Sequence, residues 1–285
     1  MKLGAGTYAW SAAGQSLQAA LEDIASIGIR HVDILGIDHG HPSMFTSSQL
    51  HDLVKLIDDL GLQISSILAL YDGNMATDNQ MERQSIFTYL HDIMEFSAML
   101  GADQILYKPG DKMIDIPYQQ AWDNSIAFTG KISELARHYN LLITFELVPR
   151  PFALVQTISD MDRMIREACR DNVFANIDLG HIALVRDGID ECAKIASKTI
   201  HLHLNDNDTY NHTNDIVGTG KAPIGAYVEA IATNGAEDLC RRLGIPCVAG
   251  IEIELGEHSK ENLSPLDITR MSRDYVLANI PSITL

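Results

Sequence analysis

Four short stretches of this sequence combine acidic and histidine side chains, and each follows a run of apolar residues. They are residues 145–146 (FE), 177–181 (IDLGH), 201–206 (HLHLND) and 252–254 (EIE). A ligand set of carboxylate oxygens and a single imidazole suits Mn²⁺, Mg²⁺ or Co²⁺, whereas an all-thiolate set suits zinc. The stretches therefore predict one divalent metal ion and a metal-dependent enzyme that acts on a sugar-like substrate.

Short apolar runs, which are typical of strands, alternate along the chain with longer stretches of helical periodicity. The expected strands are residues 3–8, 31–37, 63–70, 104–107, 141–147, 174–179, 199–204 and 247–254. The expected helices are residues 16–28, 47–59, 79–100, 119–139, 159–169, 189–197, 224–243 in two pieces, and 266–279. This alternation predicts an α/β fold, a single (β/α)₈ TIM barrel with residues 1–285 as one domain. A doubly wound open sheet is the alternative, but no G-x-G-x-x-G follows the first strand.

The composition fits a large buried core and narrows the range of partners. The chain has 285 residues, is 46% hydrophobic and carries a formal net charge of −17. A negative field repels phosphate backbones and anionic lipid, so we expect neither nucleic acid nor a membrane as a partner. The four cysteines show no C-x-x-C spacing and no signal peptide is evident, which favours reduced thiols and a cytoplasmic location. We also expect a homo-oligomer, either a dimer or a tetramer.

The barrel geometry selects individual metal ligands from the four stretches. Alternate residues of a barrel strand face the lumen, and the last inward residue before the loop lies at the catalytic mouth. This rule selects Glu146, Asp178 and His203, with His201 one layer lower. On the last strand, Glu254 is preferred to Glu252, which shares its face and remains the alternative ligand.

Other residues near expected strand ends are candidates for substrate binding. His181 follows Asp178 by three positions and could hold a substrate oxygen. Trp10 could cover an apolar sugar face, and Lys108 could orient an oxyanion or phosphate. Asp206, after the seventh strand, completes the predicted substrate-binding set.

The order of these residues resembles the xylose isomerase-like superfamily of sugar isomerases and epimerases. The motif consists of Glu on strand five, Asp-x-x-His on strand six, His-x-His on strand seven and Glu on strand eight, and it is most similar to that of ketose 3-epimerases such as D-tagatose and D-psicose 3-epimerase. The resemblance implies metal ligands at Glu146, Asp178, His203 and Glu254, and a substrate contact at His181. Mn²⁺ is the preferred ion, with Mg²⁺, Co²⁺ and Zn²⁺ as alternatives.

The chemistry that this resemblance implies is proton abstraction next to a carbonyl through an enediolate. Glu146 and Glu254 are then the catalytic acid/base pair, one on each face of the planar intermediate. Two positions depart from the epimerase pattern. Phe152 stands where those enzymes have a substrate-binding Glu, and Thr209 stands where they have an Arg. The usual ketohexose contacts are therefore not expected here.

Two alternative functions remain open on the same fold. A metal-dependent dehydratase or lyase of a small cyclic acid or polyol would use the same ligands, and Lys108, Arg150 and Arg186 could bind a carboxylate. A DNA-repair nuclease of the endonuclease IV type shares part of the motif and His212. That family needs more histidine ligands, and the net charge of −17 also disfavours it.

Overall fold

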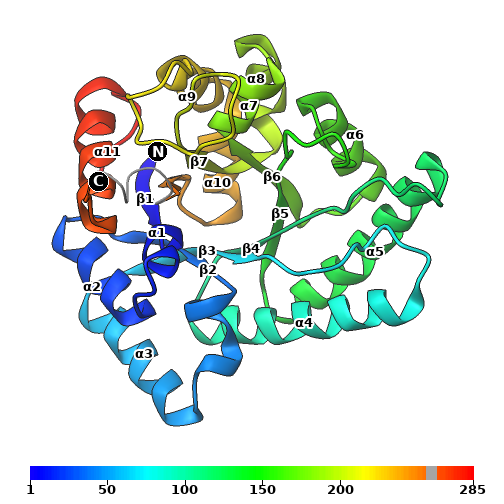
Figure 1. The fold of residues 1–285 in the computed structure, drawn as a ribbon, viewed down its shortest axis with the longest axis horizontal. Coiled ribbons are helices and arrows are strands. Elements are labelled where there is room, and N and C mark those ends of the chain that lie inside the picture. Colours follow the sequence, from blue (N-terminus) through cyan, green and yellow to red (C-terminus); the bar gives the residue numbers. More distant parts are fainter. Residues whose placement is uncertain (255–261) are drawn as a thin grey trace.

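The computed structural model describes residues 1–254 and 262–285 and forms a closed parallel barrel (Figure 1). Each strand pairs with the next, and β1 pairs with β8 in register from Lys2↔Val248 to Ala5↔Ile251, which closes the ring. The strands are β1 (Lys2–Gly6), β2 (His31–Leu35), β3 (Gln63–Ala69), β4 (Gln104–Tyr107), β5 (Leu142–Phe145), β6 (Val173–Asp178), β7 (Thr199–Leu204) and β8 (Val248–Ile251). The expected TIM barrel is thereby confirmed.

Helices surround the strands in Figure 1, and α11 lies next to β1. The α-helices are α1 (Tyr8–Ala12), α2 (Leu17–Ser26), α3 (Ser47–Asp59), α4 (Gln80–Met99), α5 (Tyr118–His138), α6 (Ile158–Ala168), α7 (Leu179–Val185), α8 (Ile189–Ile195), α9 (Ile224–Ile231), α10 (Glu237–Leu243) and α11 (Pro265–Asn279). Short 3₁₀ turns form η1 (Asp38–Gly40), η2 (Pro42–Met44) and η3 (Ala196–Lys198), and the π-helical η4 (Ala232–Ala236) joins α9 to α10. None of the helices in the described part of the chain is long and apolar enough to cross a membrane.

Local sequence signals explain where several helices begin and end. Ser16 caps α2 by accepting a hydrogen bond from the Ala19 backbone N–H. Asn79 caps α4 in the same way, through the N–H groups of Met81 and Glu82. Gly61 follows α3 with a φ of +62°, a left-handed conformation that glycine adopts at low cost.

Three differences from the expected elements affect the site. β8 ends at Ile251, three residues before the expected end at Glu254. β1 ends at Gly6, and the chain turns directly into the short helix α1. Helix α7 begins at Leu179 immediately after β6, so Asp178 is both the last strand residue and the helix N-cap. The carboxyl ends of the strands therefore lead into loops and helices earlier than the apolar patterns indicate.

The two chain termini lie close together at the barrel (Figure 1). The Met1 amino group donates to the Ser282 carbonyl at 2.8 Å, and Lys2 forms a parallel bridge with Thr284. The hydrophobic core fills the layer between the strands and the helices, with Trp122, Tyr107 and Phe145 fully buried. This layer holds the strands in the register that brings their carboxyl ends together.

Candidate metal centre

Four side chains from four consecutive strands converge at the carboxyl end of the barrel. Glu146 directly follows β5, Asp178 ends β6, His203 is the fifth residue of β7, and Glu252 directly follows β8. One ligating atom from each residue lies within 4.8 Å of the others. Four such atoms at this separation form a group that could hold a metal ion.

His203 lies between two of the carboxylates. Its Nδ1 is 2.9 Å from Glu252 Oε2 and 3.3 Å from Glu146 Oε2. Burial acts to lower the pKa of His203, but the charges of Glu252 and Glu146 outweigh it and raise that pKa well above its usual range. Burial acts to raise the pKa of Glu252, and the His203 imidazolium outweighs it, so this carboxyl stays charged. In the metal-free protein, a proton on His203 thus occupies the position that suits a cation.

The structure brings Glu252 together with the other three residues, whereas the ligand predicted on the last strand is Glu254. Glu252 and Glu254 do share a face, but β8 ends at Ile251, so Glu252 is the first inward residue beyond the strand. Glu254 lies outside the four-residue group, half-buried, with its backbone N–H donating to the Asn214 carbonyl at 3.1 Å. Burial and the Glu252 charge raise the pKa of Glu254. The rule for the last inward residue selected Glu254 because it was applied to a strand expected to end at residue 254, three residues beyond the end of β8.

Two asparagines hold the carboxylates in place. Asn176 Nδ2 donates to Glu146 Oε2 at 3.0 Å and lies 3.2 Å from His203 Nδ1. Asn205 Nδ2 donates to Asp178 Oδ2 at 2.7 Å, while Asp178 Oδ1 accepts the His181 backbone N–H at 2.7 Å. Burial raises the pKa of Asp178, and the charges of Glu146 and Glu252 raise it further. Both asparagines lie within two residues of a predicted ligand.

His181 lies in the wall of the site and contacts a second histidine. Its Nδ1 is 2.9 Å from the Leu147 carbonyl oxygen, which assigns the proton to Nδ1, and its Nε2 is 2.8 Å from His212 Nε2. His181 is buried, whereas His212 is half-buried and borders a cavity next to Arg150 and Tyr210. Burial lowers the pKa of His212, so its neutral ring can donate to His181 Nε2.

Trp10 and Asp206, two of the other predicted substrate-binding residues, are both buried. Trp10 is fully buried, and its indole N–H donates to Asp23 at 2.9 Å, so it packs inside the protein and does not cover a ligand. The carboxylate of Asp206 is 2% exposed and accepts three backbone N–H groups, those of Asn207, Gly218 and Ala222. Both side chains are therefore engaged in holding the fold.

Lys108 follows β4 and is half-buried beside the ring of Tyr71, with its Nζ 5.5 Å from the ring centroid. Burial lowers the pKa of Lys108, and the nearby guanidinium of Arg150 lowers it further. Two cations thus lie near each other on the loops that follow β4 and β5. This placement is compatible with the expected role of Lys108 in orienting an anionic or oxygen-rich group.

The opposite wall of the lumen is apolar. Leu35, Leu68 and Leu106 are register partners on β2, β3 and β4 and form a small buried cluster. Leu35 and Leu68 line a narrow cavity together with His203 and Glu252. A ligand at the metal group would therefore have oxygen and nitrogen ligands on one side and hydrocarbon on the other, which suits a molecule that carries both hydroxyl and C–H faces.

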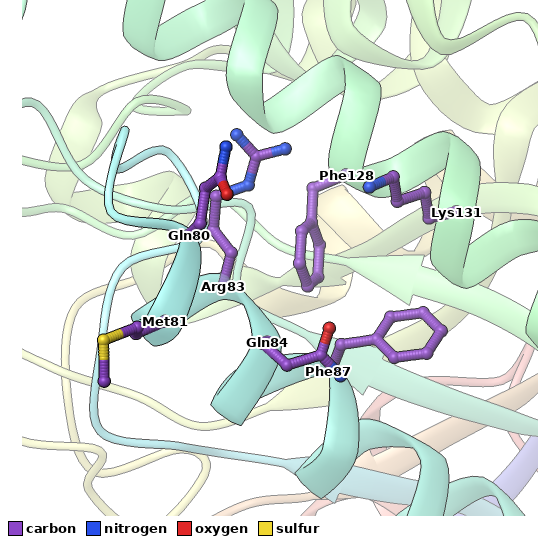
Figure 2. Close-up of a pocket in the computed structure, with 7 residues that line it drawn as sticks. All are labelled: Gln80, Met81, Arg83, Gln84, Phe87, Phe128 and Lys131. Atoms are coloured by element: carbon purple, nitrogen blue, oxygen red, sulfur yellow. The ribbon is translucent and has the colours of Figure 1, made fainter.

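A larger hollow of about 800 Å³ lies elsewhere, between α4 and α5 on the outer ring. Figure 2 shows its lining, in which Phe87 and Phe128 are accompanied by Arg83, Lys131, Gln80, Gln84 and Met81. None of these residues belongs to the four-residue group or adjoins a strand end. The hollow is therefore separate from the candidate site.

The residues present fit a divalent cation. Three carboxylates are brought within 4.8 Å of one another and largely removed from water, an arrangement that is unfavourable unless a positive charge compensates it. The donor set of carboxylate oxygens with one imidazole suits Mn²⁺, Mg²⁺, Co²⁺ or Zn²⁺.

Comparisons with known proteins agree with this fold. Residues 21–262 match the family model described as xylose isomerase-like TIM barrel. The uncharacterized protein MJ1614 of Methanocaldococcus jannaschii is 23% identical over 221 residues, which cover 78% of this chain and 84% of that protein. Among solved structures, an IOLI protein with a binding zinc atom superposes with a TM-score of 0.82 at 20% identity, covering 98% of this chain and 97% of that one.

Two further structures are described as sugar epimerases. L-ribulose 3-epimerase superposes with a TM-score of 0.79 at 20% identity, covering 99% of this chain and 95% of the other. A D-tagatose 3-epimerase-like protein superposes with a TM-score of 0.73 at 19% identity, covering 98% and 100%. At these identities the superpositions establish the fold, whereas the family match spans most of the sequence. The chain belongs to the xylose isomerase-like TIM barrel family.

Proposed function

We propose that this protein is a divalent-metal-dependent epimerase or isomerase of a ketose or a ketose-like polyol, similar in reaction to the ketose 3-epimerases. The observation that carries the proposal is the convergence of Glu146, Asp178, His203 and Glu252 at the mouth of the barrel. The similarity of the fold to that of L-ribulose 3-epimerase supports the reaction class.

Glu146 and Glu252 are the proposed acid/base pair, in place of the expected pair Glu146 and Glu254. They reach His203 from β5 and β8, so a substrate held between them presents one face to each carboxylate. One carboxylate removes the proton next to the carbonyl, and the other returns a proton to the opposite face of the enediolate, which gives an epimer. Return to the neighbouring carbon gives an aldose–ketose isomer. A divalent cation at this position supplies Lewis-acid stabilisation of the negative charge that develops on the substrate oxygens.

The two walls of the lumen orient the substrate. Hydroxyl groups face the carboxylates, His181 and Lys108, while C–H groups pack on Leu35, Leu68 and Leu106. His181 keeps its proposed substrate role. The atom that would bind a substrate oxygen is its Nε2, which lies 2.8 Å from His212 Nε2. Phe152, at the position where the epimerases have a substrate-binding Glu, is 70% exposed and offers no polar contact. The proposal therefore concerns the substrate class and not a particular ketohexose.

The proposal also covers the identity of the metal ion, the assembly state and the cellular location. Mn²⁺ is the preferred ion, with Mg²⁺, Co²⁺ and Zn²⁺ as alternatives. We propose a homo-oligomer, dimer or tetramer, in the cytoplasm, where the four free cysteines would stay reduced. Sedimentation of the purified protein checks the assembly state.

The test of the function is a substrate screen in D₂O. Ketoses, aldoses and inosose-like polyols are incubated with the protein and Mn²⁺ or Co²⁺, and the products are identified by NMR. Proton abstraction next to a carbonyl places deuterium at the substrate carbon, whereas a hydride shift gives turnover without deuterium. The Glu146→Gln variant is the matched control, because it removes one base and leaves the strand unchanged. Turnover by this variant above about a hundredth of the wild-type rate would contradict the assignment of Glu146.

A dehydratase or lyase of a small cyclic acid or polyol is the second candidate. The observation that favours it is the pair of neighbouring cations, Lys108 and Arg150, which could bind a carboxylate. The same NMR screen, extended to cyclic hydroxy acids, distinguishes it because dehydration yields an unsaturated or keto product and releases water. The endonuclease alternative is disfavoured, since His212 contacts His181 and is absent from the metal-ligating groups found among the described residues.

A further inference from the structure

A second polar group lies inside the barrel next to the candidate metal ligands. Asp33 on β2 and His201 and His203 on β7 each offer a ligating atom within 4.8 Å of the others, and all three are at most 2% exposed. Asp33 Oδ2 is 3.0 Å from His201 Nε2. His203 is therefore shared between this group and the four-residue site above.

The two ring nitrogens of His203 face different surroundings. Nδ1 is turned toward Glu146, Glu252 and Asn176. Nε2 is buried on the other edge of the ring, and neither it nor the buried Asp33 Oδ1 has a hydrogen-bond partner among the residues that the structure describes. A donor position and an acceptor position are thus both unfilled within one compact group.

The metal-ligating form of His203 needs an acceptor at Nε2. An imidazole that offers the lone pair of Nδ1 to a cation carries its remaining proton on Nε2. Leaving a buried N–H without an acceptor is unfavourable. Asp33 and His203 border the same narrow cavity. The Asp33 carboxylate, whose Oδ1 has no hydrogen-bond partner among the described residues, is the acceptor that this group offers.

The neighbouring strands leave a place for the Asp33 side chain. Gly250 of β8 pairs in register with His203, and a Cβ atom at that position would lie 1.9 Å from Asp33 Oδ2. Glycine at residue 250 thus makes room for the carboxylate. The pairing of β2 with β3 also shifts register between Val32 and Asp33.

We propose that Asp33 is a positioning residue for the metal site. One carboxylate oxygen holds His201, and the other accepts the Nε2–H of His203, which fixes the ring with Nδ1 directed at the cation. This inference rests on the proposed metal-dependent function and adds a residue of β2 to it. The rival role for Asp33 is a buried partner of His201 that supports the barrel alone.

The first measurement is the zinc affinity of the chelator-stripped protein, determined by competition with a chromophoric chelator. Loss of an outer carboxylate that orients a metal-binding histidine typically weakens metal binding by about 10 to 100-fold, and we expect this loss in Asp33→Ala. Asp33→Asn keeps one acceptor oxygen and should be intermediate. His31→Ala is the control, because it removes a buried imidazole of the same strand that interacts with the charges of Asp33 and His201 but forms no hydrogen bond to His203 among the described residues.

The second measurement is NMR of the zinc-loaded protein with ¹⁵N-labelled histidine. In the wild type, the Nε2–H proton of His203 should be downfield and slow to exchange, and in Asp33→Ala this signal should be lost or exchange rapidly. If Asp33→Ala does not fold, Asp33→Asn gives the same comparison at smaller amplitude.

Three outcomes distinguish the proposals. Weakened zinc binding in the Asp33 variants, with His31→Ala within about threefold of wild type, supports the positioning role. Wild-type affinity in the Asp33 variants, or an equal loss in His31→Ala, overturns that role and leaves the metal-dependent function intact. Failure of the wild-type protein to bind Zn²⁺, Mn²⁺ or Co²⁺ overturns the proposed function and the inference together.

Discussion

Glu252 and Glu254 lie on the same face of the chain, and the end of one short strand separates their roles. Glu252 Oε2 is 2.9 Å from His203 Nδ1, whereas Glu254 lies nearer the solvent. Burial raises the pKa of Tyr8, and the charge of Glu254 raises it further. A carboxylate within reach of the imidazole can join a metal ligand set, and one at the rim can act only on the outer part of a substrate.

The first prediction follows from this separation. Glu252→Gln should weaken Mn²⁺ binding more than tenfold and lower turnover by about 10² to 10⁴, since it removes a ligand that is also an acid/base group. Isothermal titration with Mn²⁺ and the D₂O assay measure the two effects. Glu254→Gln is the matched control and should keep the wild-type metal affinity. The reverse ranking of the two variants would return the ligand role to Glu254.

The second prediction concerns Asp103, which precedes β4 and whose side chain forms no hydrogen bond or ion pair with the residues that the structure describes. Burial raises its pKa from 3.8 to about 6. Between these two values the folded state binds a proton that the unfolded state does not, so stability falls as the pH rises from about 4 to 6. Asp103→Asn removes this penalty. We expect it to raise the free energy of unfolding by about 1 to 2 kcal/mol at pH 7.

Urea unfolding at pH 7 and at pH 4 checks the prediction for Asp103. At pH 4 the carboxyl is protonated in the folded protein, so the variant and the wild type should differ little. An equal gain at both pH values would show that the effect comes from packing and not from the proton.

At the residue scale, three of the predicted ligands lie in the four-residue group, while some of their neighbours carry no sequence signal. Glu146, Asp178 and His203 could be selected because a charge after an apolar run has few structural explanations. Asp33 and Asn176 carry no such signal, because their partners come from other strands. Trp10 and Asp206 are residue types that often bind ligands, but their contacts in the structure are structural. Trp10 donates to Asp23, and Asp206 accepts three backbone N–H groups.

At the element scale, the loop after β7 depends on one buried carboxylate. Asp206 Oδ1 accepts the N–H groups of Asn207 and Ala222 at 2.9 and 3.0 Å, and Oδ2 accepts that of Gly218 at 3.0 Å. These contacts bring the two ends of a long loop together beside the site. The conformation of the loop therefore depends on the Asp206 carboxylate, which accepts hydrogen bonds from three backbone N–H groups.

The third prediction tests this arrangement. Asp206→Asn turns an acceptor into a donor that faces a buried N–H, so it should lower the free energy of unfolding by about 1 to 3 kcal/mol. Asp208→Asn is the matched control on the same loop. Its carboxylate caps the exposed turn at Tyr210 and Asn211, and the change should cost less. Chemical denaturation of both variants measures the difference. Equal losses would show that the buried contacts of Asp206 add nothing beyond a turn cap.

The order of elements follows from the sequence, while their ends do not. The helix expected at residues 47–59 has those bounds in α3, where Thr46 and Gln49 form a capping box that local sequence specifies. The end of β8 has no such marker, because the apolar alternation continues past Ile251 to Ile253. Its end is set by pairing with β1 and β7, which is a property of the closed barrel. The difference between the predicted Glu254 and the grouped Glu252 has this non-local origin.

At the scale of the whole molecule, barrel closure gives the four ligands a common location. They come from residues 146 to 252, more than a hundred positions apart, and meet because parallel strands in register share one open end. The same closure concentrates negative charge, in a protein whose formal net charge is already −17. In the metal-free protein, the charge of His203 offsets only part of the repulsion among the three carboxylates.

The last prediction is that a bound cation stabilises the entire barrel, because the ligands from four strands come together in the folded state and not in the unfolded chain. At a free metal concentration of about 100 times Kd, the stabilisation is about 2.7 kcal/mol, which for a protein of this size raises Tm by roughly 4 to 5 °C. Thermal unfolding of the chelator-stripped protein with and without Mn²⁺ measures the shift, and added chelator should reverse it. Glu252→Gln is the control, because its other strand contacts are unchanged while one ligand is lost. A shift of equal size in Glu252→Gln would place the bound ion elsewhere on this acidic protein, and the absence of a shift in the wild type with any of the four candidate ions would contradict a metal site at the barrel mouth.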